Sequence, residues 1–99
     1  MTAGRRIIGG RYELEELPLG EGGMGEVYKG YDQQLDRRVA VKLLRFPLGR
    51  PDEMLVKRFR REARAMARLE HPGAPTIYDA DVFDDPQVGP RPFLVMQFV

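Results

Sequence analysis

The alternation of apolar and polar residues predicts a chain built mainly of β-strands. Residues 39–44 are the best strand candidate, and successive side chains of a strand point to opposite faces. One predicted face carries Val39, Val41 and Leu43, and the other carries Ala40, Lys42 and Leu44. Four further strands are predicted, by alternation over residues 11–19 and by runs of strand-forming or apolar residues over 26–32, 76–83 and 93–99.

Residues 52–69 are predicted to form a helix, because their apolar residues recur at helical spacing. The predicted sheet-facing residues are Leu55, Phe59, Ala63, Met66 and Leu69. The resulting fold is α+β, with a five-stranded antiparallel sheet and one helix packed on it. Residues 1–10 are polar and glycine-rich, and we expect them to form a flexible leader.

The composition limits the possible functions. A chain of 99 residues is enough for one small domain, and 42% apolar residues is typical of a globular protein. The net charge of +1 gives no reason to expect nucleic acid or an anionic membrane as a partner. The chain has no cysteine and no apolar stretch that could span a bilayer. We expect a cytoplasmic location, with any membrane anchor of a parent protein outside this chain.

A glycine-rich stretch at residues 19–27 reads Leu-Gly-Glu-Gly-Gly-Met-Gly-Glu-Val. Gly20, Gly22 and Gly25 fit the pattern G-x-G-x-x-G. Glycine has no Cβ, so backbone N–H groups can approach a ligand closely and form a concave surface suited to phosphate oxygens. The alternative is a flexible hairpin tip with no ligand.

The residues after these glycines narrow the choice of fold. Residues 26–31 contain valine, two tyrosines and a glycine, which favour a strand. A dinucleotide-binding fold instead places a helix directly after its glycines, and a P-loop ends in Gly-Lys-Ser/Thr. A glycine-tipped β-hairpin that covers phosphates is the arrangement of protein kinases.

Two charged residues are candidates for a catalytic ion pair. Lys42 occupies a mostly buried strand position, where an unpaired charge is costly, so it needs an anionic partner. Glu62 lies in the middle of the predicted helix, next to its apolar stripe. The alternatives are a solvated Lys42 on an edge strand and an exposed Glu62 that pairs with Arg58.

Four features in this order resemble the N-terminal lobe of a protein kinase. They are the glycine-rich loop, Val39-Ala40-Val41-Lys42, Arg60-Arg61-Glu62-Ala63 followed by His71-Pro72, and Phe93-Leu94-Val95-Met96 running into Gln97-Phe98-Val99. The chain is most similar in pattern to bacterial serine/threonine kinases related to the eukaryotic ones. The resemblance covers residues 11–99, and it implies that this segment is an ATP-binding lobe cut at the hinge.

The resemblance implies a site for ATP. Lys42 would hold the α- and β-phosphates, and Glu62 would pair with Lys42 and fix its position. Leu19, Val27 and Ala40 would contact the adenine ring from above. Met96 would line the back of the adenine pocket, and the backbone of Gln97 and Val99 would bond the adenine edge. The implied ATP-binding residues are Leu19, Gly20, Glu21, Gly22, Gly23, Met24, Gly25, Glu26, Val27, Ala40, Lys42, Met96, Gln97 and Val99.

The chain departs from the family in what it lacks. The catalytic-loop Asp and Asn and the metal-binding Asp before Phe-Gly have no match here. We therefore expect Mg²⁺ to be bound by a C-terminal lobe outside this chain, no metal site within it, and no phosphoryl transfer by it alone. The implied partners are that lobe, ATP and a protein substrate with serine or threonine hydroxyls. The alternative is a non-catalytic, pseudokinase-like module that binds a nucleotide or another protein.

Overall fold

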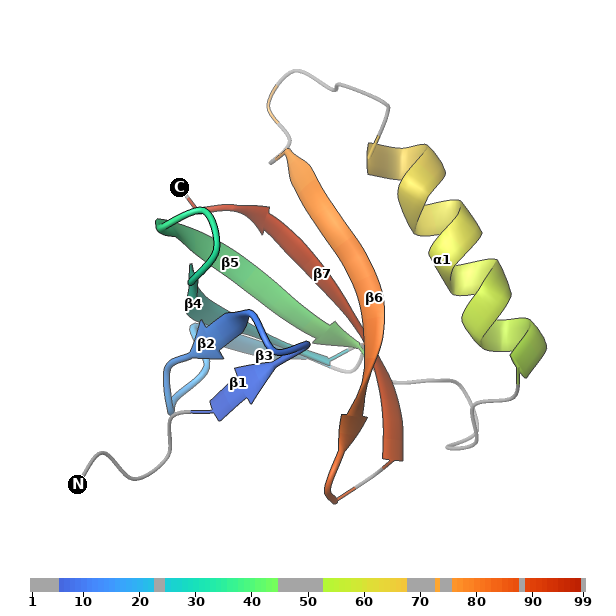
Figure 1. The fold of residues 1–99 in the computed structure, drawn as a ribbon, viewed down its shortest axis with the longest axis horizontal. Coiled ribbons are helices and arrows are strands. Elements are labelled where there is room, and N and C mark those ends of the chain that lie inside the picture. The colour runs from blue at the N-terminus through green and yellow to red at the C-terminus, as the bar shows by residue number, and fades with distance from the viewer. Residues whose placement is uncertain are drawn as a thin grey trace.

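The computed structural model describes residues 6–22, 25–44, 53–67, 73, 76–87 and 89–98. These residues form a β-sheet with one helix beside it (Figure 1). The elements are β1 (Arg6–Ile8), β2 (Tyr12–Leu14), β3 (Gly20–Gly22), β4 (Gly25–Asp32), β5 (Arg37–Leu44), α1 (Glu53–Ala67), β6 (Ile77–Asp85) and β7 (Gly89–Gln97).

All the strands belong to one antiparallel sheet. Its order is β1-β2-β4-β5-β7-β6, and β3 pairs with β4 outside this path. The predicted α+β fold is therefore confirmed. Because β5 lies between β4 and β7, Lys42 is on an interior strand, which excludes the edge-strand explanation of this residue.

The N-terminal part differs from the sequence prediction of five strands, because the described residues form seven. The flexible leader is wrong for residues 6–8, because these residues form β1 and Ile8 is 2% exposed in the core. The predicted strand over residues 11–19 is divided into β2 and β3. Pro18 lies in the gap, and a residue without a backbone N–H interrupts strand pairing.

The hydrophobic core lies on one face of the sheet, which we call the inner face. It consists of Ile8, Tyr12, Leu14, Val39, Val41, Leu43, Phe93 and Val95. The sheet curls so that the ring of Tyr12 in β2 meets the edge of Phe93 in β7, with ring centroids 6.0 Å apart. The alternation predicted for residues 39–44 is thus confirmed, since all three residues of the aliphatic set are buried.

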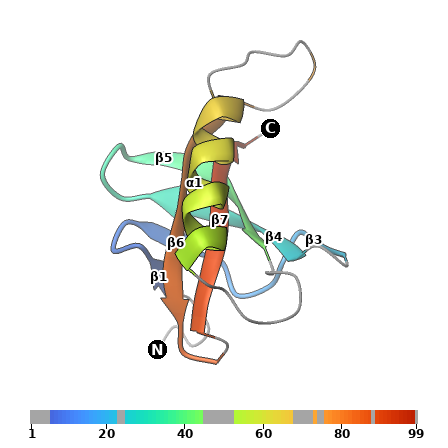
Figure 2. The same ribbon diagram turned by 90° about the vertical axis from the view of Figure 1, so that its right-hand side faces the viewer.

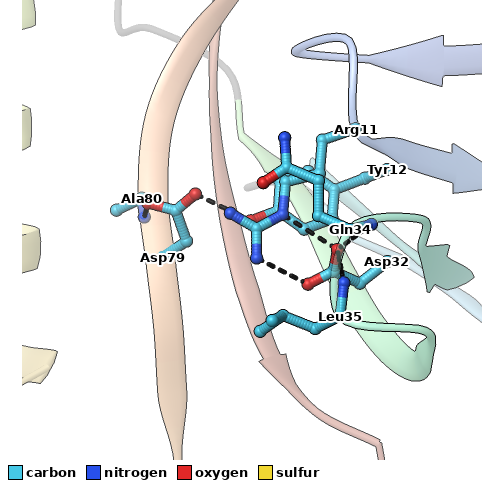
Figure 3. Close-up of polar contacts among 7 residues, drawn as sticks. All are labelled: Arg11, Tyr12, Asp32, Gln34, Leu35, Asp79 and Ala80. Carbon is cyan, nitrogen blue, oxygen red and sulfur yellow. Dashed lines mark hydrogen bonds and ion pairs between the residues drawn. The ribbon is translucent and has the colours of Figure 1, made fainter.

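A partly buried ion pair connects Arg11, just before β2, to Asp32 at the end of β4 (Figure 3). The guanidinium of Arg11 donates two hydrogen bonds to the carboxylate of Asp32, each 2.8 Å long. The backbone N–H groups of Gln34 and Leu35 donate to the same carboxylate at 2.9 and 3.1 Å. The Arg11 hydrogen bond and these backbone donors stabilise the ionised form, and they lower the pKa of Asp32 to about 2.

Tyr12 extends this network across the sheet to β6. Its hydroxyl donates a hydrogen bond of 2.8 Å to the carboxylate of Asp79. Burial and this hydrogen bond raise the pKa of Tyr12, because both disfavour the phenolate. The network therefore joins three segments that are distant in sequence (Figure 3).

Replacing Asp32 by Asn is expected to lower the free energy of unfolding by about 2–3 kcal/mol, because Arg11 then keeps a partly buried, unpaired charge. Asp32 has a lower pKa in the folded than in the unfolded chain, so its stabilising effect is present above pH 4 and is lost as the pH falls towards 2. Urea unfolding at pH 7 and pH 2.5 measures both effects. The Asp32→Asn variant should lose less stability than the parent between pH 7 and pH 2.5. An equal loss would contradict the stabilising role of the ionised Asp32.

Helix α1 lies at the β6 side of the sheet, away from β1, β2 and β3 (Figures 1 and 2). Arg60 anchors it there, because its Nη2 lies 2.8 Å from the carboxylate of Asp81 in β6. Phe59 is half-buried, as expected for a sheet-facing residue. The other predicted sheet-facing side chains, Leu55, Ala63, Met66 and Leu69, lie outside the described part of the structure. In the described ranges, no helix is both long and apolar enough to cross a bilayer.

Candidate functional site

The register of the strands brings several predicted site residues to one face of the sheet, which we call the outer face. Directly paired residues of antiparallel strands point to the same face. Val27 of β4 and Leu94 of β7 both pair with Lys42 of β5, and Met96 pairs with Ala40. These side chains are half-buried, unlike those of the inner face. The outer face thus presents apolar surface on both sides of one lysine.

The glycine-rich stretch is a β-hairpin formed by β3 and β4, as its sequence predicts. The strand directly after Gly25 excludes the dinucleotide-binding alternative, which requires a helix at that point. Gly20 pairs with Val27, so the β3 arm extends the outer face beyond β4. Gly23 and Met24, at the tip, lie outside the described residues.

The glycines of this hairpin differ in why a glycine is present at each position. Gly25 has a φ of +144°, and a Cβ at this position would lie 1.9 Å from the carbonyl oxygen of Leu43. Only glycine fits there, because of the chain's own packing. Gly20 and Gly22 are exposed, and a Cβ on either would meet nothing within 4 Å. Their bare backbone therefore leaves open space next to the outer face, which suits the close approach of phosphate oxygens.

Lys42 is half-buried on the outer face. Among the described residues, no carboxylate lies within ion-pair distance of its ammonium group. A cation in this position has lost part of its hydration without the gain of an ion pair. The site therefore favours an anion from outside the described part of the chain.

The expected ion pair between Lys42 and Glu62 is not formed in this structure, and the catalytic role of the two residues stays a prediction. Glu62 instead pairs with Arg58 one turn earlier in α1, with Nε and Oε1 3.0 Å apart. The Glu62 side chain is 61% exposed. The physical reason is the position of α1, which packs mainly against β6 at the edge of the sheet rather than against β5. This structure therefore has the alternative arrangement considered from the sequence, in which Glu62 is exposed and pairs with Arg58.

The end of β7 carries the residues predicted to contact adenine. Met96 is half-buried on the outer face, and Gln97 is exposed. The backbone N–H of Gln97 already donates to the carbonyl of Thr76 at 2.8 Å, so a contact of its backbone with an adenine edge has to use the carbonyl. Leu19, predicted to cover the ring, is 60% exposed, and Val99 lies outside the described residues.

One charged residue beside the hairpin was not found from the sequence. Arg91 in β7 is only 9% exposed, and its guanidinium contacts Glu26, the residue after Gly25. The available signal was a cation in an otherwise apolar strand, between Pro90 and Pro92. The sequence prediction left residues 84–92 between two strands, and this hid Arg91, because β6 and β7 continue through most of that segment.

Comparisons with known proteins agree with this arrangement. The chain is 46% identical over 97 residues to the serine/threonine-protein kinase PksC of Streptomyces coelicolor, and 48% identical over 89 residues to PknB of Mycobacterium tuberculosis. The chain is homologous to the N-terminal lobe of bacterial serine/threonine protein kinases. The kinase domain of Mycobacterium tuberculosis PknI superposes on this lobe with a TM-score of 0.71 at 29% sequence identity.

The chain spans only a small part of the length of these relatives. The match with PksC covers 98% of this chain but 17% of PksC, and the match with PknB covers 90% of this chain and 14% of PknB. The chain also covers 37% of the PknI kinase domain structure. No protein-family model matches the chain. Within the described residues, no group of three or more potential metal-ligating side chains is present.

Proposed function

We propose that the outer face binds ATP and that the chain acts as the nucleotide-binding lobe of a serine/threonine protein kinase. The observation that carries this proposal is the half-buried Lys42, which has no carboxylate partner among the described residues. Apolar side chains lie on both sides of it, and the open glycine arm of β3 lies beyond Val27. A base, a sugar and a chain of phosphates require this sequence of apolar surface, cation and exposed backbone N–H groups.

Each part of the proposed site has a defined task. Val27, Ala40 and Met96 provide apolar contact for the adenine ring, and Ala40 leaves room because its side chain is small. Lys42 holds the α- and β-phosphates as a point charge. The β3 arm, with Gly20 and Gly22, covers the phosphates and offers backbone N–H groups. These residues bind and orient the nucleotide, and none of them acts as the general base that accepts the proton of the substrate hydroxyl.

Glu62 reaches Lys42, in this proposal, when α1 moves from the edge of the sheet towards β5. The contact that it has to give up is weak. Arg58 and Glu62 are 69% and 61% exposed, and an exposed i,i+4 pair contributes only about 0.3–0.5 kcal/mol. A pair with the half-buried Lys42 is less screened by water, so it can outweigh this loss. The position of α1 then decides whether the catalytic ion pair exists.

The remaining parts of the reaction come from outside this chain. Transfer of the γ-phosphoryl group requires Mg²⁺ and a residue that positions the attacking hydroxyl. We propose that a C-terminal lobe supplies both, that the substrate is a protein serine or threonine, and that the reaction takes place in the cytoplasm, where ATP is available. The chain alone is then inactive.

A chimera tests this proposal. Residues 1–99 are joined to the remainder of the PksC kinase domain, and phosphorylation of serine and threonine is measured by mass spectrometry with ATP and Mg²⁺. We expect phosphorylation by the chimera and none by the chain alone. A folded chimera that does not bind ATP would refute the proposal. A chimera that binds ATP without transferring phosphate would instead support the non-catalytic module.

A further inference from the structure

Arg91 is a nearly buried cation at the end of the sheet where the glycine hairpin turns. Its residue exposure is 9%, and it lies in β7 opposite Phe83 of β6. An arginine in such a position is stable only when its guanidinium is paired and hydrogen-bonded. Its contacts therefore indicate which segments it holds together.

The guanidinium of Arg91 contacts three different strands. Its Nε donates a hydrogen bond to the carbonyl oxygen of Leu44 in β5 at 3.0 Å. Its Nη2 donates to the carboxylate of Glu26 in β4. Its Nη1 lies 3.6 Å from the carboxylate of Asp85 in β6. We call these residues, Glu26, Leu44, Asp85 and Arg91, the Arg91 cluster.

The Arg91 cluster is located near the tip of the glycine hairpin, on its β4 arm. Glu26 directly follows Gly25 and pairs with Glu21 of β3 on one side and with Leu43 of β5 on the other. The Glu26 side chain is 15% exposed, and those of Arg91 and Asp85 are 11% and 5% exposed. Charge-assisted hydrogen bonds with so little contact to water are screened weakly. The cluster therefore fixes the hairpin at Glu26, whereas the exposed β3 arm beyond it has few contacts of its own.

We propose that Arg91 is a positioning residue for nucleotide binding, which acts through Glu26 by fixing the height of the glycine hairpin above the outer face. This inference rests on the proposed ATP site. Arg91 belongs to the opposite, inner-face register of the sheet from Lys42 and touches no ligand. Its effect is on the fraction of molecules whose hairpin is already in the binding-competent position.

Replacing Arg91 by Met is expected to raise the KM for ATP in the kinase chimera about fivefold, and to leave kcat within about twofold. The apparent affinity of a ligand falls in proportion to the competent fraction, so a fivefold change corresponds to a competent fraction of about one fifth of its original value. Once ATP is bound, the hairpin is in place and the transfer step is unchanged. Glu26→Gln, which removes the other charge, is expected to shift KM in the same direction.

Asp85→Asn is the matched control. It weakens the same cluster on the β6 side, while the contact between Arg91 and Glu26 remains. We expect a lower thermal unfolding midpoint for both Asp85→Asn and Arg91→Met, but an unchanged KM for Asp85→Asn. Equal effects of the two variants on KM would overturn the positioning role and leave only a structural one.

Hydrogen exchange of the 99-residue chain without nucleotide separates this inference from the proposed function. In Arg91→Met, the backbone N–H groups of residues 20–22 and 25–28 are expected to exchange at least about tenfold faster than in Asp85→Asn, relative to those of β2 in the same molecule. Unchanged relative exchange in the hairpin would refute the inference, whatever the chimera does with ATP. Faster hairpin exchange in a chain that binds no ATP would refute the proposed function alone.

Discussion

Replacing Lys42 by Met in the kinase chimera is expected to reduce phosphoryl transfer about 100- to 1,000-fold, as does the loss of other preorganised groups that stabilise transition-state charge. Lys42 is the cation on the outer face between Val27 and Leu94, and it is the group proposed to hold the phosphates. Methionine has a similar length and keeps the packing of the stem. The measurement is the initial rate of phosphorylation at saturating ATP, together with the thermal unfolding midpoint.

The control is the same substitution at another lysine. Lys57 is exposed on α1, so Lys57→Met changes the net charge equally and should leave the rate unchanged. The unfolding midpoint of Lys42→Met should equal or exceed that of the parent, because the half-buried charge has no described carboxylate partner to lose. Full activity of Lys42→Met would remove the basis of the proposed function.

Gly25→Ala is expected to have the largest effect on stability, with a loss of about 3 kcal/mol or more. The added Cβ would lie 1.9 Å from the Leu43 carbonyl oxygen, and the φ of +144° is one that alanine rarely adopts. The neighbour is the backbone of an interior strand, so it cannot move aside as a flexible side chain could. Urea unfolding followed by circular dichroism measures the change.

Gly22→Ala is the matched control within the same hairpin. A Cβ at Gly22 meets nothing within 4 Å, so the free energy of unfolding should change by less than about 0.5 kcal/mol. Equal losses for the two variants would mean that the hairpin is constrained as a whole rather than at Gly25. If Gly22→Ala also weakens ATP binding without loss of stability, the open space at this glycine serves the ligand.

The sequence was sufficient for the parts of the fold that depend on local sequence patterns. Short runs of apolar and β-branched residues identified β5 and β7, and the residues after Gly25 identified a hairpin rather than a helix. The short strand β1 could not be predicted in this way. Its three residues carry too little pattern, and they are ordered by pairing with β2 and by the burial of Ile8.

The site was predicted less completely, because part of it depends on the placement of elements that are distant in sequence. Ala40 and Lys42 are two positions apart in one strand, so the sequence predicts that they share a face, and the structure confirms this. The position of Glu62 depends on how α1 packs against the sheet. The contact of Arg60 with Asp81 helps to fix that position, and no local sequence pattern indicates this contact. The contact of Arg91 with Glu26 joins residues 65 positions apart, beyond the reach of any local pattern.

The division of β5 between an inner and an outer face limits how the chain can change in length. A one-residue insertion or deletion that shifts β5 against β4 would exchange its two sets of side chains. The ammonium group of Lys42 would then enter the core, and Val41 or Leu43 would take its place on the opposite side. Length changes in the 33–36 turn are therefore tolerated only when the register of β5 is preserved, whereas point substitutions on either side of the strand can accumulate independently.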